Sequence, residues 1–99
     1  VGGFMASIFE EVYLKHFTRR DEDKGRYYTY GGIDPDTGSP AIRVQVTAAE
    51  GGVSVIYKHF NPGEGIDVTY SGFIPEDLQP STEGARQIIA ALAQLFPLR

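Results

Sequence analysis

The sequence predicts an α+β fold: a two-layer sandwich, with an N-terminal and a C-terminal helix on one face of a four-stranded antiparallel meander. Near both ends of the chain, apolar residues recur at three- and four-residue steps, as in amphipathic helices. Between them lie four segments rich in β-branched and aromatic residues, bounded by turn-forming residues. The breaks between these segments are too short for the crossover that parallel strands need. The expected order is therefore α-β-β-β-β-α.

The first helix is expected in IFEEVYLKHF, residues 8–17. Ser7 and Glu10 have the spacing of a capping box, in which each side chain accepts a hydrogen bond from the other residue's amide. Three- and four-residue steps place a set of largely apolar residues on one face: Phe9, Val12, Tyr13, His16 and Phe17. The polar run TRRDEDKG is expected to end the helix.

The four strands are predicted at residues 26–30, 41–47, 53–60 and 66–73. Alternation assigns one set of side chains to a core face: Tyr28, Tyr30, Ile42, Val44, Val46, Val53, Val55, Tyr57, Ile66, Val68 and Tyr70. It assigns a mostly polar set to the opposite face: Tyr27, Thr29, Arg43, Gln45, Thr47, Ser54, Ile56, Lys58, Asp67, Thr69 and Ser71. A slip of one residue would exchange the two faces, so the register is constrained.

Residues that face each other across two strands point to the same side of the sheet. On the third strand the core residues have odd numbers and on the fourth they have even numbers, so the two numbers of any facing pair must have an odd sum. A loop at residues 61–64 satisfies it. That loop places Lys58 opposite Asp67 and Val55 opposite Tyr70.

The second helix is expected after the loop PEDLQP, with Ser81 or Thr82 as the N-cap and Glu83 in the first turn. Its apolar stripe consists of Ala85, Ile88, Ile89, Leu92, Leu95 and Phe96, and Pro97 ends it. Because the sheet has one apolar face, both helices are expected to cover that face and leave the other open.

Length and composition indicate one domain over residues 1–99, with residues 1–4 as a non-native or flexible terminus. The formal net charge of −4 disfavours a general nucleic-acid binder, which needs a basic surface. The absence of cysteine excludes thiolate chemistry and fits a reducing compartment, so we expect a cytoplasmic location. No apolar run reaches the roughly 20 residues of a membrane span, and the amino end lacks the features of a secretion signal.

No pattern predicts an enzyme, a cofactor or a metal site. The segment DPDTGS, residues 34–39, begins like a calcium loop, but Gln45 stands where a bidentate Glu is needed, so a hairpin turn is expected. The chain has two histidines: His16, expected on the helix core face, and His59, expected at a strand end. Because no nucleophile elbow, phosphate loop or HExxH pattern occurs, we assign no catalytic residue.

The first functional hypothesis is a small non-enzymatic interaction protein: an adapter, inhibitor or accessory subunit. Its partner is another protein or a second copy of the chain. The predicted binding residues lie on the open sheet face: Tyr27, Thr29, Arg43, Gln45, Ile56 and Lys58. Tyr and Arg are frequent anchors of protein interfaces.

Two alternatives remain open. The segment KGRYYTY, residues 24–30, resembles the aromatic strand of an RNA-recognition sheet, on which bases stack. It suggests a single-stranded nucleic-acid-binding module that uses Tyr27 and the basic residues Arg19, Arg20, Lys24 and Arg26. Tyr28 and Tyr30 are expected on the core face, however. The other alternative is a small-ligand pocket between helices and sheet, lined by Tyr13, Tyr28, Tyr57 and Tyr70.

Overall fold

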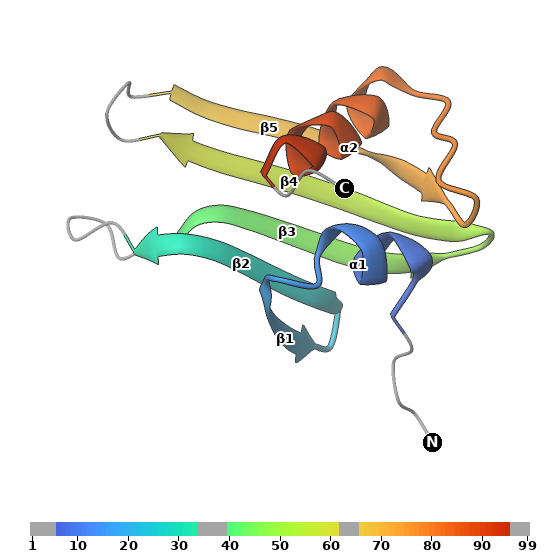
Figure 1. Ribbon diagram of the computed structural model, residues 1–99. Coiled ribbons are helices and arrows are strands. Elements are labelled where there is room, and N and C mark those ends of the chain that lie inside the picture. The colour runs from blue at the N-terminus through green and yellow to red at the C-terminus, as the bar shows by residue number, and fades with distance from the viewer. Residues whose placement is uncertain (1–5, 34–39, 62–65, 96–99) are drawn as a thin grey trace.

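The computed structural model describes residues 6–33, 40–61 and 66–95, which form two helices and one antiparallel sheet (Figure 1). In chain order the elements are α1 (Ile8–Tyr13), β1 (Thr18–Glu22), β2 (Gly25–Ile33), β3 (Pro40–Ala49), β4 (Gly52–Asn61), β5 (Ile66–Pro75) and α2 (Glu83–Leu95). The strands lie side by side in sequence order. The predicted α+β class, the antiparallel sheet and the two helices are confirmed. Within the described residues, no helix is long and apolar enough to cross a membrane.

The sheet has five strands, so the prediction of four was wrong. The additional strand, β1, comes from the run TRRDE, which was expected to end the first helix. It pairs with β2 through a tight hairpin, and Gly25 after the turn has a φ of +146°, which residues with side chains rarely adopt. All five residues of β1 are exposed. Alternating hydrophobicity therefore could not reveal this strand, because neither of its faces is buried.

Helix α1 ends at Tyr13, four residues before the predicted end at Phe17. The predicted capping box between Ser7 and Glu10 is present. His16 is exposed in the turn after the helix, so its expected place on a helical core face was wrong. Phe9 and Phe17 are both buried, but only Phe9 reaches the core from the helix. The three- and four-residue steps thus continued beyond the helix into a turn.

The two helices cover the same face of the sheet (Figure 1). That face carries the predicted core side chains, of which the following are buried: Tyr28, Ile42, Val44, Val46, Val53, Val55 and Tyr57. Val68 and Tyr70 are half-buried, and Tyr30 is 36 % exposed at the end of β2. The side chain of Ile66 lies outside the described residues. Alternation therefore assigned the two faces correctly.

Facing residues on β4 and β5 have numbers with an odd sum, as predicted, but the register is shifted by two residues from the predicted one. Asn61 faces Ile66 and Lys58 faces Thr69, so the predicted facing pair of Lys58 and Asp67 was wrong. The predicted pair of Val55 and Tyr70 was wrong for the same reason, since Tyr57 faces Tyr70. A shift of two residues leaves every side chain on its own face. Hydrophobic alternation cannot distinguish the two registers.

Helix α2 begins against the outer strand β5. Its N-cap is Thr82, whose hydroxyl accepts a hydrogen bond from the Ala85 amide at 3.4 Å. Three residues of the predicted stripe, Ala85, Ile88 and Leu92, are buried. A Cβ atom at Gly84 would lie 2.1 Å from the carbonyl oxygen of Ser71, so the helix approaches the strand at a distance that requires glycine.

Helix α1 is held to β2 by a buried polar cluster, which we call the Glu10 cluster: Glu10, Arg26 and Tyr28. Glu10 and Arg26 are 2 % and 4 % exposed. The guanidinium of Arg26 donates two hydrogen bonds to the carboxylate through Nε and Nη2, the latter at 2.8 Å. The Tyr28 hydroxyl donates another at 2.7 Å. Burial and the bond to Glu10 together raise the pKa of Tyr28.

The protonation of Glu10 follows from this arrangement. Burial raises the pKa of the carboxyl, but the hydrogen bonds from Arg26, Tyr28 and Ser7 outweigh it and bring the pKa from 4.5 to about 2. The folded protein therefore holds Glu10 as a carboxylate at neutral pH.

We expect Gly84→Ala to destabilise the fold by about 1–3 kcal/mol, because the new methyl group must displace helix α2 from Ser71. The sign of this change in unfolding free energy is informative, since Gly→Ala within a helix ordinarily stabilises by roughly 0.5–1 kcal/mol. Chemical denaturation measures the free energy of unfolding. The reverse change at the exposed residue Ala90, Ala90→Gly, calibrates helix propensity in the same helix. A gain in stability for Gly84→Ala would contradict the close approach.

The Glu10 cluster predicts a specific sensitivity to acid. Because the pKa of Glu10 is lower in the folded than in the unfolded chain, its stabilisation is complete above pH 4.5 and is lost as the pH falls toward about 2. The loss should amount to roughly 3 kcal/mol. It is measured as the difference in unfolding free energy between the native chain and the double variant Glu10→Leu/Arg26→Met. A difference that does not change over this pH range would exclude the mechanism.

The single variant Arg26→Met provides the matching control for the double variant. It should cost more stability at neutral pH than Glu10→Leu/Arg26→Met, because it leaves a buried carboxylate without its cation.

Candidate interaction surface

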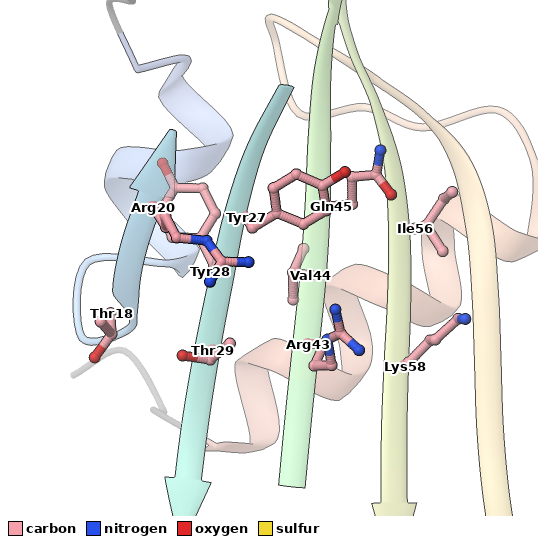
Figure 2. Close-up of a pocket in the computed structure, with 10 residues that line it drawn as sticks. All are labelled: Thr18, Arg20, Tyr27, Tyr28, Thr29, Arg43, Val44, Gln45, Ile56 and Lys58. Carbon is pink, nitrogen blue, oxygen red and sulfur yellow. The ribbon is translucent and has the colours of Figure 1, made fainter. Parts of the chain in front are cut away.

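The face of the sheet opposite the helices, which we call the open face, contains a surface groove of about 420 Å³ (Figure 2). All six residues predicted to bind a partner line it: Tyr27, Thr29, Arg43, Gln45, Ile56 and Lys58. Thr18, Arg20, Tyr28 and Val44 complete the lining. The structure thus brings the predicted residues together in one concave region that spans β1 to β4.

A line of hydrogen-bond donors crosses the open face at right angles to the strands. The strand registers place one residue of each strand in this line, which we call the donor row: Thr18, Thr29, Arg43, Lys58 and Thr69. Neighbouring strands are about 4.8 Å apart, so adjacent members of the row are close neighbours. Every member donates hydrogen bonds, and none is a carboxylate that only accepts them.

The next line of residues along the strands is less polar, and we call it the mixed row: Arg20, Tyr27, Gln45, Ile56 and Ser71. Figure 2 shows the ring of Tyr27 extending toward Gln45, its partner on β3. Ile56 is 40 % exposed and lies between Gln45 and Ser71 in this row. The groove therefore offers an aromatic and an aliphatic contact beside the donor row.

The charges of the groove are unbalanced. Three cationic residues line it, Arg20, Arg43 and Lys58, whereas none of the described lining residues is Asp or Glu. Arg20 forms a salt bridge of 2.6 Å with Glu22. Arg43 and Lys58 face each other directly on β3 and β4, and neither forms an ion pair with a described residue. Like charges in directly opposed positions destabilise a sheet.

The four basic residues of the nucleic-acid alternative do not form one surface. Arg19 donates two hydrogen bonds to Asp21, at 2.7 and 3.0 Å, and this lowers the pKa of the Asp21 carboxyl. Arg19 and Arg20 are adjacent on β1, so their side chains point to opposite faces. Arg26 is buried in the Glu10 cluster. Lys24 lies in the β1–β2 turn, beside a second, shallower depression lined also by Glu22, Asp23 and Tyr27.

The tyrosines of the small-ligand alternative contribute to the core and its rim. Tyr28 and Tyr57 are buried, and Tyr57 stacks on Tyr70 with ring centroids 5.9 Å apart. Tyr13 lies 5.7 Å from Phe9, measured between ring centroids. These rings make contacts typical of core aromatic residues.

The remaining polar candidates form no cluster in the described part of the chain. The Nδ1 atom of His59 lies 3.5 Å from the Tyr57 hydroxyl. No group of three His, Cys, Asp or Glu residues that could hold a metal ion occurs among residues 6–33, 40–61 and 66–95. The segment 34–39, with the spacing of a partial calcium loop, lies outside these residues.

Four residues of the two rows were not among the predicted binding residues: Thr18, Arg20, Thr69 and Ser71. Ser71 was placed on the open face but not beside Ile56. Thr18 was assigned to the end of a helix, and Arg20 was assigned to a basic segment rather than to the open face. Thr69 was placed on the open face but not beside Lys58, because the predicted register was two residues away. The sequence does contain one indication of β1: a turn, Asp23-Lys24-Gly25, directly before a strongly predicted strand.

The chain matches no known protein-family model, no curated protein and no solved structure. Its function is therefore inferred from the geometry and chemistry of the open face.

The facing cations predict that Lys58→Glu stabilises the fold. The new carboxylate would face Arg43, so repulsion becomes attraction, with a gain of about 0.2–1 kcal/mol in unfolding free energy. Lys58→Thr should give an intermediate value, because it removes the repulsion without adding a partner. The gain should shrink at high salt, which screens exposed charges. Denaturation of the three proteins at low and high ionic strength measures it, and a Lys58→Glu protein less stable than the native chain would refute the predicted repulsion.

Proposed function

We propose that this chain is a non-enzymatic protein-interaction domain, an adapter, inhibitor or accessory subunit, that binds its partner through the open face. The observation that carries the proposal is the pair of facing cations, Arg43 and Lys58, in a groove lined by all six predicted binding residues. The open face of an antiparallel sheet is ordinarily a solvated polar surface. Two like charges at its centre, neither of them in an ion pair with a described residue, reduce stability, and a partner that neutralises them accounts for their presence.

The groove also contains the apolar contacts that a protein partner requires. Ile56 is exposed on β4, and Tyr27 is half-buried on β2, with Gln45 between them. Interfaces commonly combine aromatic or aliphatic anchors with Arg and a polar surround. This combination supports a protein partner, which can be a second copy of the chain. The cytoplasm is the expected compartment, since the chain has no cysteine to form disulfides.

A single-stranded nucleic-acid-binding module is the second candidate. Tyr27 favours it, because a half-buried ring that lines a groove with cations can stack on a base. The burial of Arg26 and the pairing of Arg19 and Arg20 with carboxylates count against it.

Site-specific photo-crosslinking tests the proposed surface. A photoreactive amino acid at Gln45, in the centre of the groove, should crosslink to the partner in extracts of the native host, or to a second copy of the purified chain. The same group at Glu11, exposed on helix α1, should not. Sedimentation of the purified chain at micromolar concentration distinguishes self-association from binding of another protein. Crosslinking from Glu11 but not from Gln45 would place the interface on the helix side and refute the proposal.

A pair of exposed isoleucines provides matched variants for the same assay. Ile56→Ala should weaken partner capture, whereas Ile8→Ala should leave it unchanged, since Ile8 is 50 % exposed in α1, on the helix side. Both variants should keep the thermal stability of the native chain to within a few degrees, because neither side chain is buried.

A further inference from the structure

The donor row restricts which kind of partner segment can bind the open face. We infer that the open face binds an extended acidic peptide segment that crosses the strands along the donor row. This inference rests on the proposed function and goes further by naming the kind of segment bound. It follows from the charge, the spacing and the shape of the groove.

The charge of the groove is opposite to that of the whole chain. The formal net charge is −4, yet Arg43 and Lys58 leave the centre of the open face positive. Glu22 neutralises Arg20 at one end of the groove, so the positive potential is concentrated on β3 and β4. Such a patch attracts carboxylates and repels basic segments, and therefore selects an acidic partner.

The spacing of the donor row fits an extended segment. Directly opposed side chains such as those of Arg43 and Lys58 have Cβ atoms about 4.5–5.5 Å apart. Residues i and i+2 of an extended peptide point to the same side and lie about 6.6–6.8 Å apart. The long Arg and Lys side chains span this small difference, so two acidic residues at i and i+2 can each meet one cation. Arg43 can bind its carboxylate through two parallel hydrogen bonds.

The ends of the donor row and the mixed row complete the description of the segment. Thr29 and Thr69 flank the two cations and can donate to peptide carbonyls or to further carboxylates. Ile56, on the mixed row, lies on β4 two residues before Lys58 and points to the same face. An apolar residue adjacent to the acidic pair would contact Ile56. The matching segment thus contains two acidic residues two positions apart and an apolar neighbour.

A single-stranded nucleic acid fits this groove less well. Sheet surfaces that bind single strands stack two or three bases on separate aromatic residues. Among the described lining residues, Tyr27 is the one aromatic side chain on the open face, and Ile56 stands two strands away in the same row. A phosphate backbone would find cations at Arg43 and Lys58, but the described lining of the groove offers its bases one ring on this face. The exposed ring of Phe73 lies on the same face but outside the groove, where it faces Ser54.

Fluorescence anisotropy with labelled synthetic peptides tests the inference on the full chain at low salt. The probe is a short peptide with Glu at i and i+2 and an adjacent Leu. Matched peptides carry Gln or Lys in place of both Glu residues. We expect the Glu peptide to bind at least about tenfold more tightly than the Gln peptide, and the Lys peptide not to bind. Binding of the Glu peptide should weaken as salt is raised.

The Lys58→Glu protein is the decisive variant, because it is expected to fold at least as well as the native chain. It should lose binding of the Glu peptide by tenfold or more. Lys15→Glu makes the same change of charge in the turn after α1 and should leave binding unchanged. Equal binding of the Glu and Gln peptides, or tighter binding of an oligothymidylate than of the Glu peptide, would overturn the inference.

Capture of the native partner by the two variants shows whether the inference of an acidic segment fails alone or together with the proposed function. If the Lys58→Glu protein still binds the partner while the Ile56→Ala protein does not, the open face is the interface, but the inference that it binds an acidic segment is wrong. If both variants keep the partner, the open face is not the interface and both proposals fail.

Discussion

A single buried carboxylate, Glu10, links the first helix to the sheet. It accepts hydrogen bonds from the helix cap at Ser7 and from Arg26 and Tyr28 on β2, so it joins local helix formation to tertiary packing. A buried ion pair gives little net stability, but breaking it is expensive, because the remaining charge stays out of water. The cluster therefore specifies where α1 lies, and with it which face of the sheet is covered. It also removes Arg26 from the surface.

The open face is mostly polar because most apolar side chains of the sheet point to the face that the helices cover. Most apolar side chains of the central strands lie beneath the helices, whereas Ile56 on β4 and Tyr30 on β2 are exposed. The side chains of the two rows on the central strands are a tyrosine, a threonine, a glutamine, an isoleucine and two facing cations. Twisted strands bring them into a groove rather than a flat surface. An acidic chain thus carries a small positive region whose potential is not cancelled by a described neighbour.

The two edges of the sheet show how the fold limits pairing to other strands. Strand β1 is short, exposed and charged, and its arginines pair with carboxylates of the same strand. Strand β5 is longer, and the start of α2 lies against it at Ser71, where only glycine allows the approach. Charged and covered edges are both known protections against edge-to-edge association. The open face is therefore the more accessible route to a partner.

The sequence by itself determined the fold class, the presence of both helices, four of the strands and the faces of the described residues on those four strands. These features depend on local periodicity, since alternation and the capping box need only near neighbours. Tertiary structure alone decided the fifth strand, whose exposed residues carry no hydrophobic pattern, and the β4–β5 register, because a shift of two residues preserves both faces. It also decided that Arg26 is buried against Glu10, sixteen residues away in the chain. Alternation places Arg26 on the same face as Tyr28, but pairing between distant charges leaves no periodic signal, so no local pattern could identify Glu10 as its partner.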